Sequence, residues 1–201
     1  MKKVSVYEFY EIISDPINSN EENQIVVQNS DLPEVDDELS ISLRLKLKNH
    51  TSGWGTIFHK GTEVLIRTPG LWLSPQKSML HPRFTGNWNR NAGIGEIENG
   101  LLLNRWYHLT YTLSDPKKRL DFYINGEWVG LYGIQNVQTQ KVIFNDGPLY
   151  IGRSFINDGF NGEISNFRYF NWRLSVEEVM KNYLVRMLML SDFLHVQAFL
   201  Y

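Results

Sequence analysis

Hydrophobic and polar residues alternate strictly between Leu39 and Leu47, which is the most regular two-residue period in the chain. Leucine and isoleucine occupy the odd positions of this segment, and serine, arginine and lysine occupy the even positions. Successive side chains of a β-strand point to opposite faces of a sheet. The pattern therefore predicts a long strand with one buried face and one face that is wet or lines a groove.

Short strands and frequent turns are predicted between Trp106 and Leu174, where β-branched and aromatic residues that fit a pleated surface are concentrated. Asn125-Gly126 supplies the two positive φ angles of a type I′ turn and predicts a hairpin. Such spacing indicates one antiparallel all-β sandwich or barrel. The strands expected here cover residues 106–113, 120–124, 127–131, 149–152 and 163–170, with turns at Asp146-Gly147, Asp158-Gly159 and Asn161-Gly162.

The remaining chain is expected to divide into an N-terminal extension (residues 1–23), one sandwich domain (24–184) and an apolar C-terminal tail (185–201). Three alternatives stay open for this tail. It continues the preceding helix, it breaks near Ser191-Asp192, or it needs a partner that covers its apolar side chains. Residues 81–100 fit no simple pattern. Shorter strands, separated by glycine and proline, are predicted at residues 24–28, 56–61, 64–66 and 71–73.

One helix is predicted to begin at Ser175. Ser175 and Glu178 have the spacing of a capping box, in which each side chain accepts a hydrogen bond from the backbone of the other. Apolar residues then recur with helical spacing from Val176 to Leu184. We expect this short helix to pack across an end or an edge of a sheet.

Composition narrows the function classes. The formal net charge of −2 provides no general basic field, which disfavours a nucleic-acid partner. With no cysteine, the chain forms neither disulfides nor thiolate metal sites, and this tilts the expected compartment toward the cell interior.

Targeting signals are also not predicted. Met1-Lys2-Lys3 resembles the start of a signal peptide, but Glu8, Glu11 and Asp15 interrupt the apolar run that would have to follow. The chain has no apolar run of the roughly 18 residues that a membrane span needs. The sequon Asn49-His50-Thr51 would be an acceptor only in the secretory pathway, and the compartment stays open.

Several stretches of the predicted sheet carry a family resemblance in their order and spacing. They are Trp106–Thr110, Leu120–Glu127, Leu149–Arg153, Phe160–Ile164 and Phe170–Ser175. Together they resemble the concanavalin A-like lectin/glucanase superfamily, and most closely its laminin-G-like and pentraxin-like branch. The resemblance implies a two-sheet antiparallel jelly roll with a binding site at its loops or concave face. It also implies recognition of glycans or proteins, often with calcium, in secreted or surface proteins.

The irregular segment between residues 81 and 91 is the strongest candidate for a binding site. A sugar ring stacks its C–H face on an indole, while its hydroxyl groups pair with amide and guanidinium groups. The alternative is a long loop whose tryptophan tucks into the core while asparagines close turns. The candidate ligand-binding residues are Trp88, Asn87, Asn89, Arg90, His81 and Arg83.

Glu34-Val35-Asp36-Asp37-Glu38 has the E-x-D-x-E pattern of the family-16 glucanases of the same superfamily. On an extended strand, Glu34, Asp36 and Glu38 would share one face, as two catalytic carboxylates of a retaining hydrolase must. Asp37 would then point into the core as an unpaired carboxylate, which is strongly unfavourable. A solvated acidic loop is the preferred interpretation, and no catalytic residue is assigned.

Calcium is a possible cofactor, and the oxygen ligands available are Asn145-Asp146 and Asn157-Asp158 with backbone carbonyls. Both aspartates precede glycine, so turn chemistry explains them equally well. The five histidines show no metal-binding spacing.

The function predicted from the sequence is non-catalytic carbohydrate recognition. The first alternative is a protein-interaction domain, with self-association through the apolar tail, and a family-16-like glucanase is the third.

Overall fold

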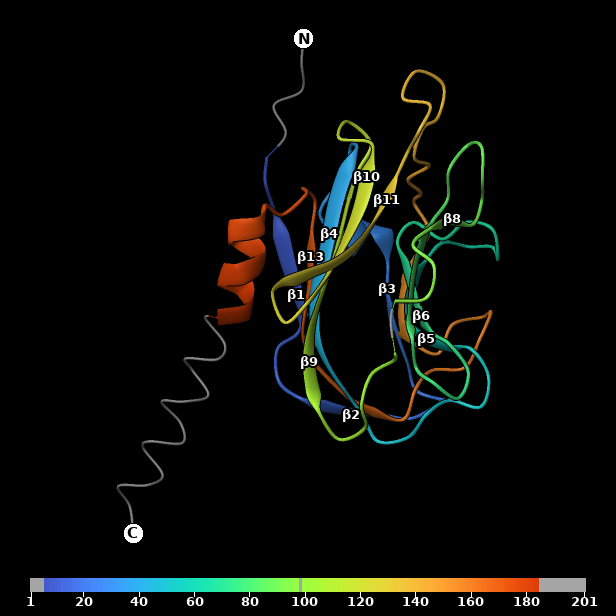
Figure 1. Cartoon of the computed structure of the whole chain (residues 1–201), viewed down its shortest axis with the longest axis vertical. Coiled ribbons are helices and arrows are strands. Elements are labelled where there is room, and N and C mark those ends of the chain that lie inside the picture. Colours follow the sequence, from blue (N-terminus) through green and yellow to red (C-terminus); the bar gives the residue numbers. More distant parts are fainter. Residues whose placement is uncertain (1–5, 98, 185–201) are drawn as a thin grey trace.

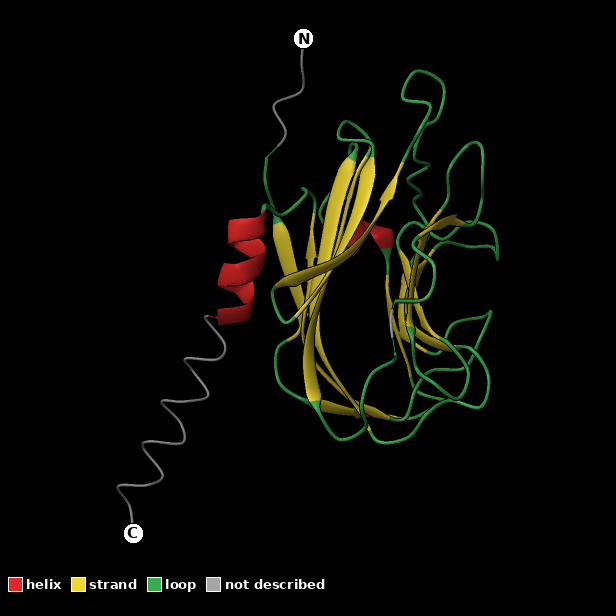
Figure 2. Cartoon of the chain, in the orientation of Figure 1, coloured by secondary structure: helices red, strands yellow, loops and turns green. Residues whose placement is uncertain are grey.

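The computed structural model describes residues 6–97 and 99–184, and these form two antiparallel β-sheets that face each other with a short helix outside one of them (Figures 1 and 2). The predicted jelly-roll sandwich is confirmed. The predicted tail, residues 185–201, lies outside the described residues.

The first sheet has seven strands in the order β1-β13-β4-β9-β10-β11, with β2 beside β13. Long strands dominate it because its central segments keep a strict alternation of apolar and polar residues. Its strands are β1 (Phe9–Ile13), β2 (Ile17–Ser19), β4 (Glu38–Leu47), β9 (Trp106–Ser114), β10 (Arg119–Ile124), β11 (Glu127–Gly133) and β13 (Gly162–Phe170).

The second sheet has six strands in the order β3-β12-β5-β6-β7-β8. A 3-10 turn, η1 (Asn29–Asp31), follows the first strand of this sheet in the sequence. The strands are β3 (Gln24–Val27), β5 (Gly55–Lys60), β6 (Gly70–Leu73), β7 (Leu80–Phe84), β8 (Ala92–Gly93) and β12 (Leu149–Gly152).

The core lies between the two sheets. The five apolar residues of the alternating segment in β4 are at most 1% exposed, which confirms the buried face predicted from their period. Aromatic rings bridge the two layers: Phe58 of β5 meets Tyr111 of β9 and Phe167 of β13 edge to face, at centroid distances of 6.0 and 5.8 Å. These contacts hold the outer faces of both sheets in fixed positions.

The hairpin between β10 and β11 has the predicted turn. Asn125 and Gly126 adopt φ angles of 54° and 80°, as a type I′ turn requires. The Asn125 side chain also accepts a hydrogen bond from the backbone N–H of His108 at 2.9 Å. The turn is therefore tied to the neighbouring strand β9.

The structure differs from the sequence prediction at three places. Residues 9–13 and 17–19, expected in an N-terminal extension, form β1 and β2 and pair with β13. Residues 64–66 form no strand but an exposed turn closed by one bridge between Glu63 and Ile66. The unassigned region contains β7 and β8, and Pro82 fits inside β7 because β8 pairs only with Arg83 and Phe84.

The helix covers residues 176–184 and lies against the outer face of the seven-stranded sheet (Figure 1). Its capping box is confirmed: Ser175 N–H donates to Glu178 Oε2 at 2.7 Å, and Glu178 N–H donates to Ser175 Oγ at 3.2 Å. Leu174 and Val179 are buried with Phe170 beneath the helix. The cap thus fixes where the helix leaves the sheet.

Replacing Ser175 with alanine is expected to lower the free energy of unfolding by about 1 kcal/mol, because one backbone donor of the first helical turn loses its acceptor. Urea unfolding of Ser175→Ala measures this, with Ser52→Ala in an exposed turn as the control. A loss in Ser175→Ala no larger than in the control would contradict the role of the cap.

Candidate functional site

Trp88, the centre of the predicted binding loop, is half-buried and packs on the core. Its ring lies edge to face on Phe84 at a centroid distance of 5.9 Å. The indole also lies so close over Gly86 that a Cβ there would come within 2.4 Å of it. These contacts match the alternative in which Trp88 has a packing role, and ligand binding by Trp88 stays a prediction.

The neighbouring asparagines hold the loop together. Asn87 accepts from the backbone N–H of Lys141 and donates to the carbonyl of Thr139, both at 2.9 Å. Asn89 accepts from the backbone N–H of Asn91 at 2.9 Å, as in an Asx turn. Arg90 is exposed beside them. The amides expected to face a sugar are therefore used within the loop.

His81 and Arg83 lie elsewhere, on the outer face of the six-stranded sheet. Arg83 Nε donates to His81 Nε2 at 2.6 Å, and the His81 ring rests on the exposed indole of Trp54 at a centroid distance of 4.8 Å. The structure thus separates the six predicted residues into a loop group and a sheet-face group.

Aromatic rings continue across this outer face. His59 of β5 touches Trp72 of β6, Tyr150 of β12 and Phe155, with centroid distances of 5.6, 6.2 and 5.1 Å. Strand pairing explains why these rings lie together. Tyr150 lies opposite His59, and Trp72 lies opposite His81, so these side chains share the face that points away from the core. Phe155 and Trp54 are the exposed rings at its surface.

Two guanidinium groups lie on the same face. Arg67 lies 5.5 Å above the Trp72 ring and donates to Asn91 Oδ1 at 3.0 Å and to the carbonyl of Val64. Arg83 donates to the carbonyl of Asn91 at 3.2 Å. Asn91 therefore accepts from both cations. We call the group Trp54, Arg67, His81, Arg83 and Asn91 the basic aromatic face.

Burial keeps the two histidines of this surface neutral. Desolvation lowers the pKa of His59 to about 4 against the opposing effect of its hydrogen bond with the carbonyl of Ile66. Desolvation, then the charges of Arg83 and Arg67, lower the pKa of His81 to about 4. At neutral pH the positive charge of the face therefore belongs to the two arginines.

Three buried polar atoms near this face have no protein partner: His59 Nδ1, Trp72 Nε1 and Arg67 Nε. Buried polar groups in folded proteins are nearly always hydrogen-bonded, so exceptions that gather in one place call for an explanation. All three atoms are buried, so they are unsatisfied groups beneath the face and not contacts open to a ligand.

Sequence reasoning missed most of this surface. Trp72 stands between two inward-facing leucines in the strand predicted at 71–73, and this alternation already places it on the outer face. Trp54 and Phe155 lie in loops far apart in the sequence, and only the order of strands β12, β5, β6 and β7 brings them to one face.

The acidic segment has the form of a loop, as preferred from the sequence. Only Glu38 lies in a strand, and its carboxylate accepts a hydrogen bond from Ser114 Oγ. Burial, followed by the neighbouring charges of Glu38, Asp36 and Asp115, raises the pKa of Asp37. The single-strand alignment that a pair of catalytic carboxylates required is not formed.

The two candidate calcium-binding pairs lie at opposite ends of β5. Asn145 donates to the carbonyl of Lys60 at 3.2 Å, whereas the carbonyl of Asp158 accepts from Thr56 at 2.8 Å. Four residues of strand separate these points by about 13 Å, so the pairs cannot bind one ion together. Within residues 6–97 and 99–184, no three His, Asp or Glu side chains group as a metal site would need.

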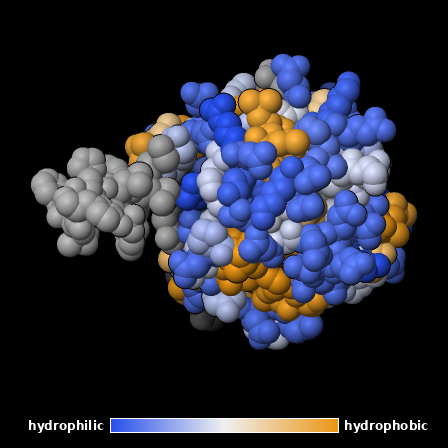
Figure 3. Space-filling model, turned by 90° about the horizontal axis from the view of Figure 1, so that it is seen from below, coloured by the Kyte–Doolittle hydropathy of each residue, from blue (hydrophilic) through white to orange (hydrophobic). Residues whose placement is uncertain are grey.

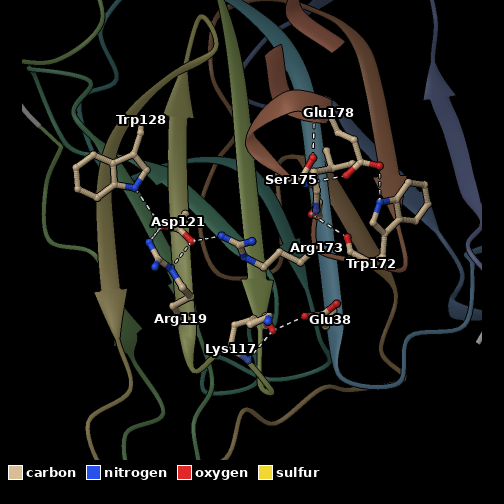
Figure 4. A network of polar contacts seen from close by, with 12 residues as sticks. Glu38, Lys117, Arg119, Asp121, Trp128, Trp172, Arg173, Ser175 and Glu178 are labelled. Carbon is tan, nitrogen blue, oxygen red and sulfur yellow. Dashed lines mark hydrogen bonds and ion pairs between the residues drawn. The ribbon is translucent and has the colours of Figure 1, made fainter. Parts of the chain in front are cut away.

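On the other sheet, Trp128 and Trp172 belong to a polar network (Figure 4). Trp128 Nε1 donates to Asp121 at 3.0 Å, and Trp172 Nε1 donates to Glu178 at 3.3 Å. The fully buried Asp121 also accepts from Arg119 at 2.7 Å and from Arg173 at 2.8 Å. Both tryptophans therefore have hydrogen-bonding partners within the domain.

The end of the sandwich seen from below carries apolar patches separated by hydrophilic residues (Figure 3). Scattered apolar surface of this kind is normal for a folded domain. None of the helices in the described part of the chain has the length and apolar character needed to cross a membrane.

A sequence model from the laminin G group of the concanavalin A-like lectin/glucanases superfamily matches residues 19–180. The chain belongs to this superfamily. The match begins before residue 24, in agreement with the pairing of β2 to β13, and it confirms the resemblance of the laminin-G-like sheet segments. No match was found among curated proteins.

Solved structures with the same fold include a binding domain of botulinum neurotoxin serotype D, with 16% identity and a TM-score of 0.66. The match covers 92% of this chain and 47% of the toxin chain. Trypanosoma rangeli sialidase in complex with the inhibitor DANA also matches, with 18% identity, a TM-score of 0.56, and coverage of 74% and 23%. The laminin-G-like domain therefore spans less than half of either protein, and these identities show the fold alone.

Proposed function

We propose that this laminin-G-like domain is a non-catalytic recognition domain that binds carbohydrate through its basic aromatic face. The observation that carries the proposal is the exposed indole of Trp54, which is held against His81 beside two guanidinium groups. An indole offers a platform for the C–H face of a sugar, and guanidinium groups are directional donors to its oxygens. Groups suited to both kinds of contact lie on the same outer face of the six-stranded sheet.

The chemistry of the face favours binding over hydrolysis. Glycoside hydrolysis ordinarily uses two carboxyl groups that flank the glycosidic bond. The titratable groups of the basic aromatic face are instead two arginines and the neutral His81, and the neutral His59 lies on the same side of the sheet. The receptor binding domain of botulinum neurotoxin D has the same fold, which agrees with recognition as a use of such a domain.

Trp54→Ala is expected to weaken the binding of the best glycan on a glycan array by about tenfold or more, because a buried tryptophan contact commonly dominates an interface. Trp128→Ala on the opposite sheet is the matched control, since the two tryptophans are 39% and 53% exposed. Unfolding curves of both variants separate lost binding from lost folding. Equal binding by Trp54→Ala and the unchanged protein would contradict the proposed face.

The same array separates the alternatives. Binding that disappears on chelation would assign calcium a role, and a blank array together with self-association would favour the protein-interaction domain. Release of reducing sugar from β-glucan that is lost in Glu34→Gln would show a glucanase and overturn the proposal.

A further inference from the structure

Arg67 and Arg83 have no carboxylate partner, unlike three half-buried arginines of the seven-stranded sheet and its helix segment. Arg119 and Arg173 pair with Asp121, and Arg168 pairs with Glu11 at 2.9 Å. The recorded hydrogen bonds of Arg67 and Arg83 go instead to backbone carbonyls, to the side chain of Asn91 and to His81.

The two charges are close enough to act on each other. Desolvation is the main cause that lowers the pKa of both guanidinium groups, and the charge of Arg67 lowers the pKa of Arg83 further. Guanidinium groups nonetheless stay protonated at any physiological pH. His81 lies between Arg83 and Trp54 and is neutral, so it adds no negative charge to the pair.

An anion on this face would therefore meet two positive charges that burial has already partly desolvated. Asn91 holds the two guanidinium groups from one residue, which fixes their relative position without neutralising them. Guanidinium forks bind carboxylate and sulfate groups with paired hydrogen bonds.

We propose that Arg67 and Arg83 bind an anionic group, a carboxylate or a sulfate ester, carried by a sugar whose ring stacks on Trp54. This inference rests on the proposed carbohydrate-binding function and adds the ligand class: an acidic glycan. A neutral glycan would leave the two cations uncompensated when the face is covered, and this raises the selectivity for an acidic one.

Calorimetric titration with three probes tests the ligand class. The probes are an oligogalacturonate, the neutral oligosaccharide obtained by reducing its carboxyl groups, and a sulfated derivative of that neutral oligosaccharide. The oligogalacturonate or the sulfated probe, or both, should bind about tenfold more tightly than the neutral one at low salt, and the difference should shrink as salt is added. The pattern between the two acidic probes identifies the anionic group.

Arg67→Gln and Arg83→Gln should each remove most of this difference while changing the affinity for the neutral probe by less than about threefold. Arg67→Lys keeps the charge without the planar fork, so it should recover only part of the acidic affinity. Arg105 is an exposed arginine just before β9 of the other sheet, and Arg105→Gln makes the same change in net charge and should have no effect.

The outcomes distinguish failure of the acidic ligand class from failure of carbohydrate binding itself. Equal binding of neutral and acidic probes would overturn the inference and leave carbohydrate recognition standing. Binding of polyglutamate as tightly as of the acidic glycans would show that charge alone is recognised and would also overturn it. If none of the three sugar probes nor any array glycan binds, the proposed function itself fails.

Discussion

Replacing Asp121 with alanine is expected to destabilise the domain by about 3–5 kcal/mol, because it leaves the arginines that surround a fully buried carboxylate without their counter-ion. Asp121 lies on β10, and Arg119, Arg173 and Trp128 all donate to it (Figure 4). Hydrogen bonds from these donors outweigh desolvation and lower the pKa of Asp121. Arg173 also connects the sheet to the segment that leads into the helix.

Urea unfolding at neutral pH measures the effect. Asp121→Asn keeps the shape of the side chain but removes the charge, and it should lose nearly as much stability. Arg153→Ala, whose ion pair with Asp158 is exposed, is the control and should lose less than about 1 kcal/mol. A loss in Asp121→Ala as small as in this control would show that the network contributes little.

Acidification is the second condition with a large expected effect. His59 and His108 are 0% and 6% exposed, and desolvation is the main cause that lowers the pKa of each from 6.5 to about 4. In the unfolded chain both protonate near pH 6.5, whereas in the folded chain they stay neutral until about pH 4. The unfolded state therefore binds more protons in this window, and stability falls as the pH falls from 6.5 to 4.

Between pH 7 and pH 4.5 each of these histidines should reduce the free energy of unfolding by about 2–3 kcal/mol. Asp121 contributes little in this window, because its stabilising effect is lost only as the pH falls below the ordinary carboxyl pKa of 3.8. His59→Gln and His108→Gln should each flatten the pH dependence by that amount. Unfolding curves at the two pH values measure this. An unchanged pH dependence of the free energy of unfolding in both variants would contradict the assignment of the effect to His59 and His108.

Most of the fold could be predicted from the sequence because its signals are local. The alternation in β4, the Asn125-Gly126 turn and the capping box at Ser175 each act within a few residues, and the structure has all three. The edge strand β1 carried no such signal, since it pairs only with β13 and is half exposed. The short strand β7 could not be predicted, because it contains Pro82 and proline argues against a strand.

The candidate site was predictable only in part, for a different reason. The sequence places aromatic, amide and guanidinium groups together between residues 81 and 91, and His81, Arg83 and Asn91 of that segment do lie on the basic aromatic face. Their partners Trp54 and Arg67 lie further away in the sequence, and strand pairing brings them to the same face. Trp88 carries the same chemistry in the sequence and packs on Phe84 in the structure, and ligand binding by Trp88 stays a prediction.

The central claim is that ligand binds the outer face of the six-stranded sheet, and the indole N–H signals of the six tryptophans test it directly. In an NMR titration with the tightest-binding glycan of the array, the signal of Trp54 should show the largest shift, while Trp106 and Trp128 on the other sheet should stay unchanged. A largest shift at Trp88, Trp106 or Trp128 with Trp54 unmoved would contradict the account.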